Sequence, residues 1–196
     1  MKYLDLLLNE EKIFNKWISK EIYAEKDFFE ILIAQLVANT AGILAGSLIA
    51  FYKDALLLIP GLLILIPGFL EMKGSIFGSL NARIGSALHV NKKVSHRFIL
   101  SNITSSFILA IILSTALGLI AFLATKIIFG VATIKIVYFS LIAGIISSLI
   151  LIPVSVKTNL WLFKHGYDPD DIMGPYITSL EDIISIIAFV IAMMLI

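Results

Sequence analysis

This chain of 196 residues contains no cysteine and few charged residues. The missing cysteine excludes disulfide bonds and thiolate metal sites. Charged residues make up 15% and apolar residues 59% of the sequence, whereas soluble domains average about 25% and roughly 45–50%. A water-soluble fold of this size cannot bury so much apolar surface, so a lipid bilayer is the expected solvent. The formal net charge is only +1, whereas a protein that binds nucleic acid usually carries a basic stripe, so nucleic acid is not expected as a partner.

Five apolar segments each approach the roughly 20 residues that a spanning helix needs; they cover 28–51, 55–70, 98–124, 131–156 and 175–196. The second segment is short and is interrupted by Pro60-Gly61 and Pro67-Gly68. We interpret 71–90 as its continuation, a broken helix buried in protein, because lipid does not tolerate unsatisfied backbone groups. The predicted fold class is all-α, an integral membrane bundle of five transmembrane helices with a broken second helix.

Residues 1–27 alternate charged and apolar groups near helical spacing. This pattern predicts an N-terminal amphipathic helical segment lying on the membrane, and a short helix packed on the bundle is equally compatible with it. The acidic residues in this stretch argue against a cleaved signal peptide. We therefore divide the chain into an interfacial segment, 1–27, and one five-helix transmembrane domain, 28–196.

The basic residues predict the orientation of the chain in the cell membrane. Twelve of the 15 Lys and Arg residues lie in the N-terminal segment, the second-to-third connection or the fourth-to-fifth connection, and three lie on the other side. In this count Lys73 and Arg83 belong to the second-to-third connection. The positive-inside rule then places the N-terminus in the cytoplasm and the C-terminus outside.

Small residues recur every fourth position along the first predicted span, at Ala34, Ala38, Gly42, Gly46 and Ala50. Such a stripe allows two helix backbones to approach closely. The pattern does not distinguish a helix of the same chain from a second copy. Polar residues of the first and third spans, among them Gln35, Asn39, Thr40, Asn102 and Thr104, are expected mainly to form hydrogen bonds between helices.

The last loop and span carry the strongest candidate site. If Pro175 occupies the first turn of the last helix, Asp182 lies about 10 Å along it. An ionised carboxylate at that depth costs at least ~2.5 kcal/mol unless it meets a partner or water. Thr178 lies one turn earlier on the same face, and oxygen ligands of this kind suit Mg²⁺. Two alternatives remain: a structural carboxylate paired with Arg83, or one bonded to a backbone donor.

Two motifs resemble the MgtE-like magnesium transporters, most closely the membrane domain shared with solute carrier family 41. The first motif covers 67–75, PGFLEMKGS, and continues to Ala82-Arg83. The second joins Asp168-Pro169-Asp170, Pro175 and 178–182, TSLED. The likeness extends over about residues 28–196.

The resemblance implies a homodimer of five-helix units in the lipid bilayer, with one path for divalent cations on the two-fold axis. Asp182 of each copy would hold a largely hydrated Mg²⁺, or Mn²⁺ or another divalent cation, assisted by Thr178. Asp168 would lie at the cytoplasmic mouth, and the stretch with Glu71 and Ser75 would line the path. In this sequence Ser75 replaces the usual asparagine of the family, and Glu181 replaces a small residue.

Several functional alternatives stay open at this point. Within transport, ion-coupled exchange competes with a passive channel. A membrane enzyme that uses a metal-bound phosphate substrate is a different class, but no general-base arrangement accompanies the acidic residues, so we expect no enzyme. A structural membrane subunit is the third class. Glu181 points some 100° from Asp182 on a helix, so we expect it to pair with a lysine or reach the interface.

Overall fold

A computed structural model describes residues 28–29, 31–91 and 94–196 of the chain. The predicted amphipathic segment 1–27 lies outside these residues. Helices dominate the described residues, which contain no strand, and five of these helices are long and apolar enough to cross a membrane. The predicted all-α class with five spans is thereby confirmed.

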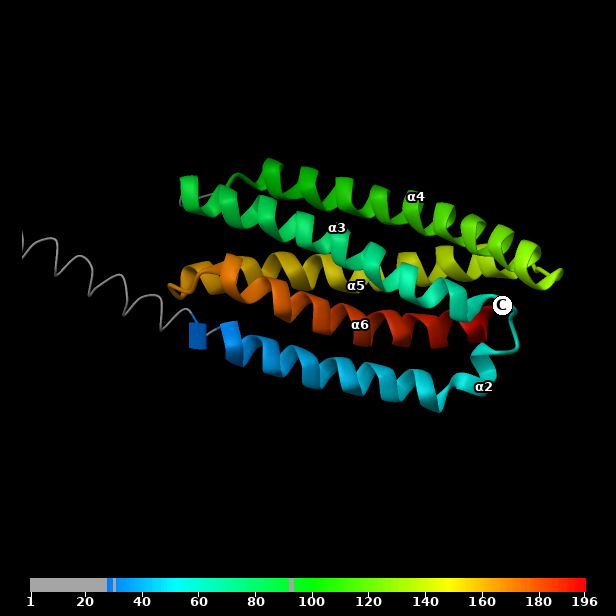
Figure 1. The fold of residues 1–196 in the computed structure, drawn as a ribbon. Helices are drawn as coiled ribbons and strands as arrows, with labels where there is room; N and C mark the ends of the chain where they lie inside the picture. The colour runs from blue at the N-terminus through cyan, green and yellow to red at the C-terminus, as the bar shows by residue number, and fades with distance from the viewer. Residues whose placement is uncertain (1–27, 30, 92–93) are drawn as a thin grey trace, which may run out of the picture.

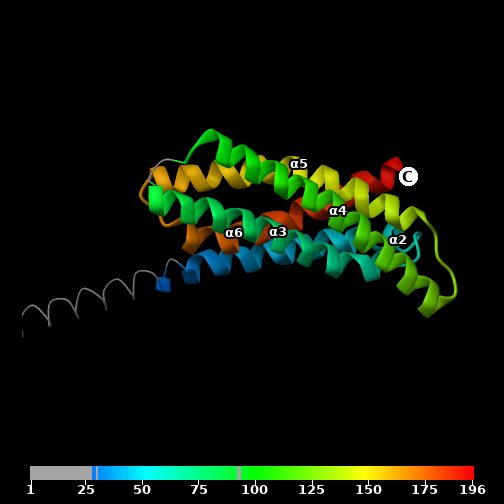
Figure 2. The same cartoon turned by 90° about the horizontal axis from the view of Figure 1, so that it is seen from above.

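The first span runs over Ile31–Phe51. It is followed by the short α2 (Lys53–Leu56) and by four long helices, α3 (Leu62–Asn91), α4 (His96–Phe129), α5 (Lys135–Lys164) and α6 (Pro169–Leu195). Figures 1 and 2 show the long helices side by side and alternating in direction. The α3–α4 and α5–α6 connections therefore lie at one end of the bundle, and the C-terminus lies at the other.

Local sequence explains where these helices begin and end. Ser95 caps α4, because its hydroxyl accepts a hydrogen bond from the Phe98 backbone N–H at 3.2 Å. Gly130 ends the same helix in the left-handed conformation, with φ of 69°. Gly166 follows the end of α5 with a similar φ of 80°.

The break in the second span lies at residues 57–61, between α2 and α3. Gly61 has a φ of 89° there and follows Pro60, so this pair interrupts the helix as predicted. The expected second interruption at Pro67-Gly68 is wrong. Pro67 is the sixth residue of α3, and its missing N–H leaves only one early carbonyl unpaired, so the helix continues through it. Residues 71–90 are thus part of α3 itself.

The last helix also begins earlier than predicted. Pro169, rather than Pro175, is its first residue, and Pro175 lies inside the helix. Asp182 is consequently the fourteenth of 27 residues, about 20 Å from the start instead of 10 Å. The candidate carboxylate therefore lies near the middle of the span.

The core of the bundle consists of two apolar clusters separated by a polar layer. One cluster gathers around Phe69, Phe139 and Phe189, towards the end that holds the C-terminus. The other gathers around Phe77 and Leu151. Between the two clusters along the chain lie buried polar groups: Lys73, Ser147, Ser148, Glu181 and Ser185.

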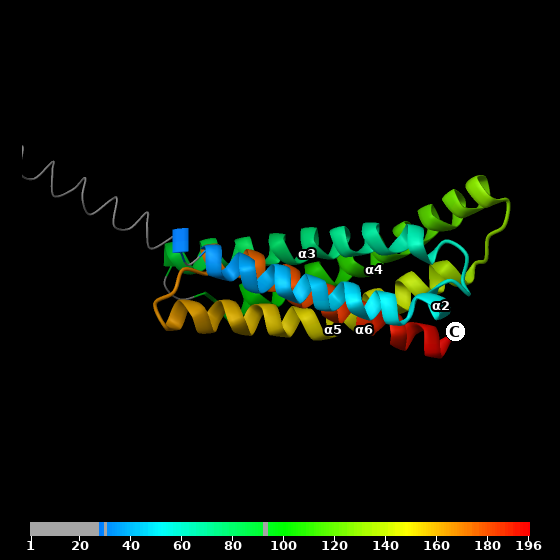
Figure 3. The ribbon, with the colours of Figure 1, turned by 60° about the horizontal axis from the view of Figure 1, so that its bottom comes forward.

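The first span packs differently from the other helices. Only 6% of its most apolar window is buried within the chain, whereas the corresponding value is 56% for α5. Figures 1 and 3 show this span running lengthwise along the bundle before α2 leads into α3. Its contacts with the rest of the chain include a depression shared with α6.

Candidate functional site

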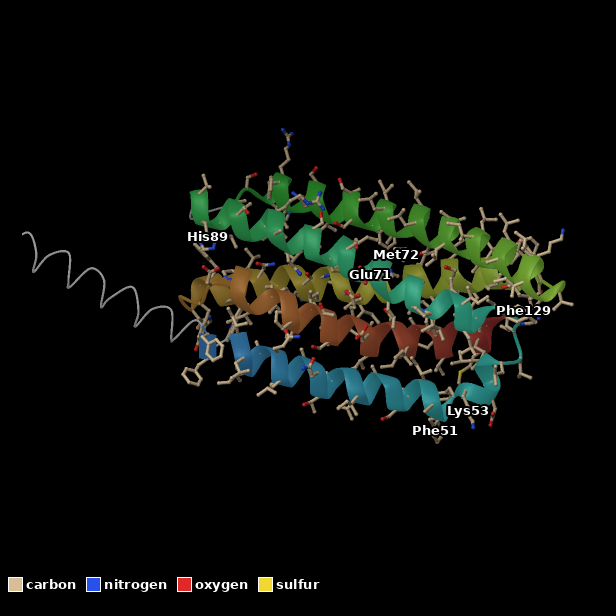
Figure 4. All side chains as sticks on the ribbon, viewed as in Figure 1. Phe51, Lys53, Glu71, Met72, His89 and Phe129 are labelled. Atoms are coloured by element: carbon tan, nitrogen blue, oxygen red, sulfur yellow. The ribbon has the colours of Figure 1, made fainter. Side chains whose placement is uncertain are left out.

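The central feature of the candidate site is a groove between α3 and α6, here called the α3 groove. Its volume is about 560 Å³. It is lined by Pro67, Leu70, Glu71, Gly74, Ser75, Thr178, Glu181 and Asp182. Four of the five residues selected from the sequence, all except Asp168, thus line one concave surface. Figure 4 shows Glu71 about midway along the bundle.

A second groove, between the first span and α6, adjoins the first one. This first-span groove has a volume of about 640 Å³ and is lined by Gln35, Ala38, Asn39, Gly42, Ile43, Gly174, Pro175, Thr178, Ser179 and Asp182. Asp182 and Thr178 belong to both grooves. The Thr178 hydroxyl donates to the Gly174 carbonyl at 2.9 Å, which leaves its oxygen able to accept a hydrogen bond from water.

The polar residues of the first and third spans behave differently from the prediction. Thr40, Asn102 and Thr104 each donate to the carbonyl four residues earlier in their own helix, at 2.9 Å in all three cases. The expected hydrogen bonds between helices are therefore wrong for these three. Gln35 and Asn39 instead line the first-span groove beside Asp182.

Asp168 lies apart from the other predicted residues. It precedes α6, and Asp182 follows it by fourteen residues, or about 20 Å of helix. Its Oδ1 is 3.1 Å from Nε2 of His89, at the opposite end of α3 from the break. Figure 4 shows His89 at that end of the bundle. Asp168 does not share the grooves of Asp182.

Lys73 is the main residue that the sequence reasoning misplaced. We counted it among the charges of a connection, but it lies inside α3 and its side chain is fully buried, with 0% exposed. Its Nζ donates to the Gly144 carbonyl at 2.9 Å and to Ser148 Oγ at 2.6 Å, both on α5. Arg83 is inside α3 as well. The sequence analysis ended the apolar part of the second span at residue 70, so it placed Lys73 outside the span. A lysine within a spanning helix would have predicted a buried partner for its ammonium group.

Arg83 does not pair with Asp182, which was the structural alternative to a metal site. Its guanidinium donates to the Ser79 carbonyl at 3.1 Å and approaches Ser106 Oγ at 3.5 Å, on α4. Among the described residues no ion pair between Arg83 and Asp182 is present. Asp182 is half-buried and opens on both grooves, so water or an ion can reach its carboxylate.

Glu181 is buried beside Asp182, with 1% of its side chain exposed. A Cβ placed on Gly74 would lie 3.3 Å from its Oε1, a tight contact, so glycine at this position lets the carboxylate approach α3 closely. The predicted pairing of Glu181 with a lysine is not present as an ion pair among the described residues, although Lys73 is the residue that precedes Gly74 in α3. The prediction did not anticipate burial in the core.

A single copy of the chain offers an incomplete metal site. Within residues 28–29, 31–91 and 94–196, no three His, Cys, Asp or Glu side chains converge closely enough to hold a metal ion. The grooves therefore provide carboxylate, hydroxyl and amide oxygens on an open surface, without an enclosed coordination shell.

Comparison with known proteins identifies the family. The model of the MgtE family, described as divalent cation transporter, matches residues 66–192, more than half of the chain. The chain belongs to the MgtE family. The MgtE match spans α3 to α6 and begins after the first span. No curated protein and no solved structure matches the chain.

Membership of the MgtE family assigns divalent cation transport to this multi-pass membrane protein. It also confirms the expectation that the chain is a transporter rather than an enzyme, so the interpretation as a membrane enzyme is wrong. The α3 groove lies entirely between two helices of the matched MgtE region.

Proposed function

We propose that two copies of this chain form a homodimer that carries Mg²⁺ across the cell membrane along a path on the two-fold axis. The observation that carries the proposal is the position of Asp182, half-buried at the middle of α6 and open to two polar grooves. A carboxylate at such a depth is costly in a spanning helix unless it has a functional or structural partner. Because the MgtE family is described as divalent cation transporter, we take a divalent cation as the partner of Asp182.

The ion in this proposal keeps most of its water. Mg²⁺ dehydrates reluctantly and is usually held by one or two carboxylates together with several waters. Asp182 of the two copies supplies two carboxylates in all, while oxygen atoms of Thr178, Ser75 and Glu71 accept hydrogen bonds from the bound waters. Mn²⁺ can substitute for Mg²⁺ at a site of this kind, because oxygen ligands suit both ions.

The dimer is motivated by the incompleteness of the site in one copy. No set of three ligating side chains converges within the described residues, so facing grooves are needed to surround an ion. Closed two-fold symmetry is the commonest way to place the same side chain twice around one point. A mass measurement in nanodiscs should give a dimer; monomers that still transport would contradict this part of the proposal.

The proposed orientation places the start of the first span in the cytoplasm and the C-terminus outside. Lys73 and Arg83 no longer count, because both lie at least eight residues from the end of α3, deeper than the other basic residues of the long helices. Ten basic residues then remain on the predicted cytoplasmic side, and three, Lys53, Lys126 and Lys135, lie on the other side. This excess still favours a cytoplasmic start of the first span. A cysteine added after Ile196 should react only with a reagent applied from outside.

We further propose that 28–196 acts as one transport domain, related to the membrane domain of solute carrier family 41, with 1–27 as an interfacial segment. Removal of 1–27 should leave dimeric, folded protein.

The decisive variant for this function is Asp182→Asn, which keeps the shape and removes the charge. It should abolish Mg²⁺ flux into proteoliposomes, or reduce it at least about a hundredfold, while the dimer remains folded. Asp182→Glu should keep part of the flux. Parental flux in Asp182→Asn would show that the path lies elsewhere.

The same flux assay, repeated with and without Na⁺ or H⁺ gradients, distinguishes the two modes of transport. Flux that follows the Mg²⁺ gradient alone indicates a channel, and dependence on a second gradient indicates coupled exchange.

A further inference from the structure

The polar layer of the core contains one cation and one carboxylate. Lys73 comes from α3 and is completely buried. Its ammonium group lies 5.3 Å from the ring centroid of Phe69 and 5.8 Å from that of Phe77, one ring from each apolar cluster. These contacts, with the hydrogen bonds to Gly144 and Ser148, fix the ammonium in place.

The groups that bind Lys73 do not neutralise it. A carbonyl and a hydroxyl satisfy two of its three N–H donors but carry no formal charge. A buried charge without a counter-charge is strongly unfavourable in a membrane protein. An anion close to Lys73 is therefore expected on physical grounds.

Glu181, from α6, is the carboxyl group of this polar layer. Its carboxyl group lies against Gly74, the residue next to Lys73, since a Cβ built on Gly74 would be 3.3 Å from Oε1; among the described residues it forms no direct ion pair with Lys73. Its Oε2 is buried and has no hydrogen-bond partner among the described residues. The same side chain forms part of the wall of the α3 groove beside Asp182. The pair thus lies directly behind the surface on which an ion would move.

We propose that Lys73 and Glu181 form a charge-compensated pair that tunes the affinity of the α3 groove for divalent cations. Lys73 weakens cation binding by repulsion, Glu181 strengthens it by attraction, and together they leave the carboxylates of Asp182 and Glu71 as the uncompensated charges of the groove. Neither residue needs to be a ligand of the ion; both act through the local potential, which is strong where water is excluded. This inference rests on the proposed passage of the cation through the α3 groove.

The proposal predicts that substitutions of Lys73 and of Glu181 shift the Mg²⁺ concentration for half-maximal flux in opposite directions. Glu181→Gln leaves a buried ammonium uncompensated, so the Mg²⁺ concentration for half-maximal flux should rise about tenfold. Lys73→Met leaves an extra carboxylate, so that concentration should fall about tenfold. The double variant Lys73→Met/Glu181→Gln restores neutrality and should lie close to the parent. Ser148→Ala, which removes a hydrogen bond of Lys73 but no charge, should change the value less than about twofold.

The test measures half-saturating Mg²⁺ twice, by flux into proteoliposomes and by Mg²⁺-dependent thermal stabilisation of purified dimer. A purely structural pair would lower the melting temperature of both single variants without opposite shifts in half-saturation. Shifts in the same direction, no shift, or a Ser148→Ala effect as large as that of Lys73→Met would overturn the proposal.

Two further outcomes separate this inference from the proposed function. If Lys73→Met does not fold, the double variant is compared with Glu181→Gln alone: a tenfold lower half-saturation supports the pair, and equal values refute it. If Asp182→Asn transports like the parent while the pair variants still shift Mg²⁺ affinity in opposite directions, the path through Asp182 fails and the pair stands.

Discussion

The first span and the four-helix bundle α3–α6 meet the membrane in different ways. In the first span 6% of the most apolar window is buried, against 39% in α3, 22% in α4, 56% in α5 and 44% in α6. The first span is also the only one of these helices outside the matched MgtE region, which covers 66–192. Apolar surface needs no protein cover in lipid, so hydrophobicity alone does not predict which helix packs.

Small residues illustrate the difference between the two regions. The stripe at Ala34, Ala38, Gly42, Gly46 and Ala50 is evident in the sequence, yet a Cβ added to Gly42 or Gly46 would meet nothing within 4 Å. A second stripe is buried on α4, at Asn102, Ser106, Ala110, Ser114, Gly118, Ala121 and Thr125. It lets α5 approach so closely that a Cβ on Gly118 would lie 2.9 Å from Cα of Val137. Regular spacing therefore indicates that close packing is possible, and the partner decides whether it occurs.

The largest expected difference between the regions concerns glycine substitution. Gly144→Ala should destabilise the bundle by about 1–3 kcal/mol, because the new Cβ would lie 2.6 Å from Cβ of Ser114. Gly46→Ala, the matched change in the first span, should alter stability by less than about 0.5 kcal/mol. Thermal unfolding of the purified protein measures both. Equal losses would mean that the first span is packed as tightly as α5.

A smaller effect is expected for hydroxyl groups. Ser140 donates to the Ser114 carbonyl on α4 at 2.7 Å, in the buried core. Ser140→Ala should cost about 0.6–1.7 kcal/mol, the range for hydrogen bonds between membrane helices. Thr40 donates within its own helix on the exposed first span, so Thr40→Val should leave the melting temperature unchanged. A Thr40→Val loss that matches the Ser140→Ala loss would remove the distinction between the two regions.

The smallest expected effect tests whether the first span contributes to the ion path. Asn39 lines the first-span groove together with Asp182. Asn39→Leu removes a polar contact to the hydrated ion, so Mg²⁺ flux should fall by roughly twofold to tenfold. Thr40→Val, one residue further along, serves as the matched control and should transport normally. Normal flux in Asn39→Leu would restrict the path to the α3 groove.

The sequence predicted the five membrane helices because the length of an apolar segment reports directly on its ability to span a membrane. It placed Asp182 and Thr178 one turn apart, since helical spacing is local. It could not predict the environment of Lys73, which depends on Gly144 and Ser148, more than seventy residues away. The burial of Glu181 was missed for the same reason, because Gly74 of α3 makes room for it.

Helix boundaries were the other source of error. Proline was taken to interrupt a helix at Pro67 and to begin one at Pro175, although both residues lie within the first two turns of longer helices. There the lost backbone hydrogen bond involves a carbonyl close to the helix end, so the helix tolerates the ring. Moving the start of α6 to Pro169 shifted Asp182 from near one end of the span to its middle.

The central claim is that a hydrated divalent cation binds between the Asp182 carboxylates of two copies. The most direct measurement is anomalous diffraction from crystals of the dimer grown with Mn²⁺. The account predicts one peak on the two-fold axis between the two Asp182 side chains, about 4 Å from the carboxylate oxygens, because water lies between. The peak should vanish in Asp182→Asn. A peak elsewhere, such as beside Asp168, with none near Asp182 would contradict the account.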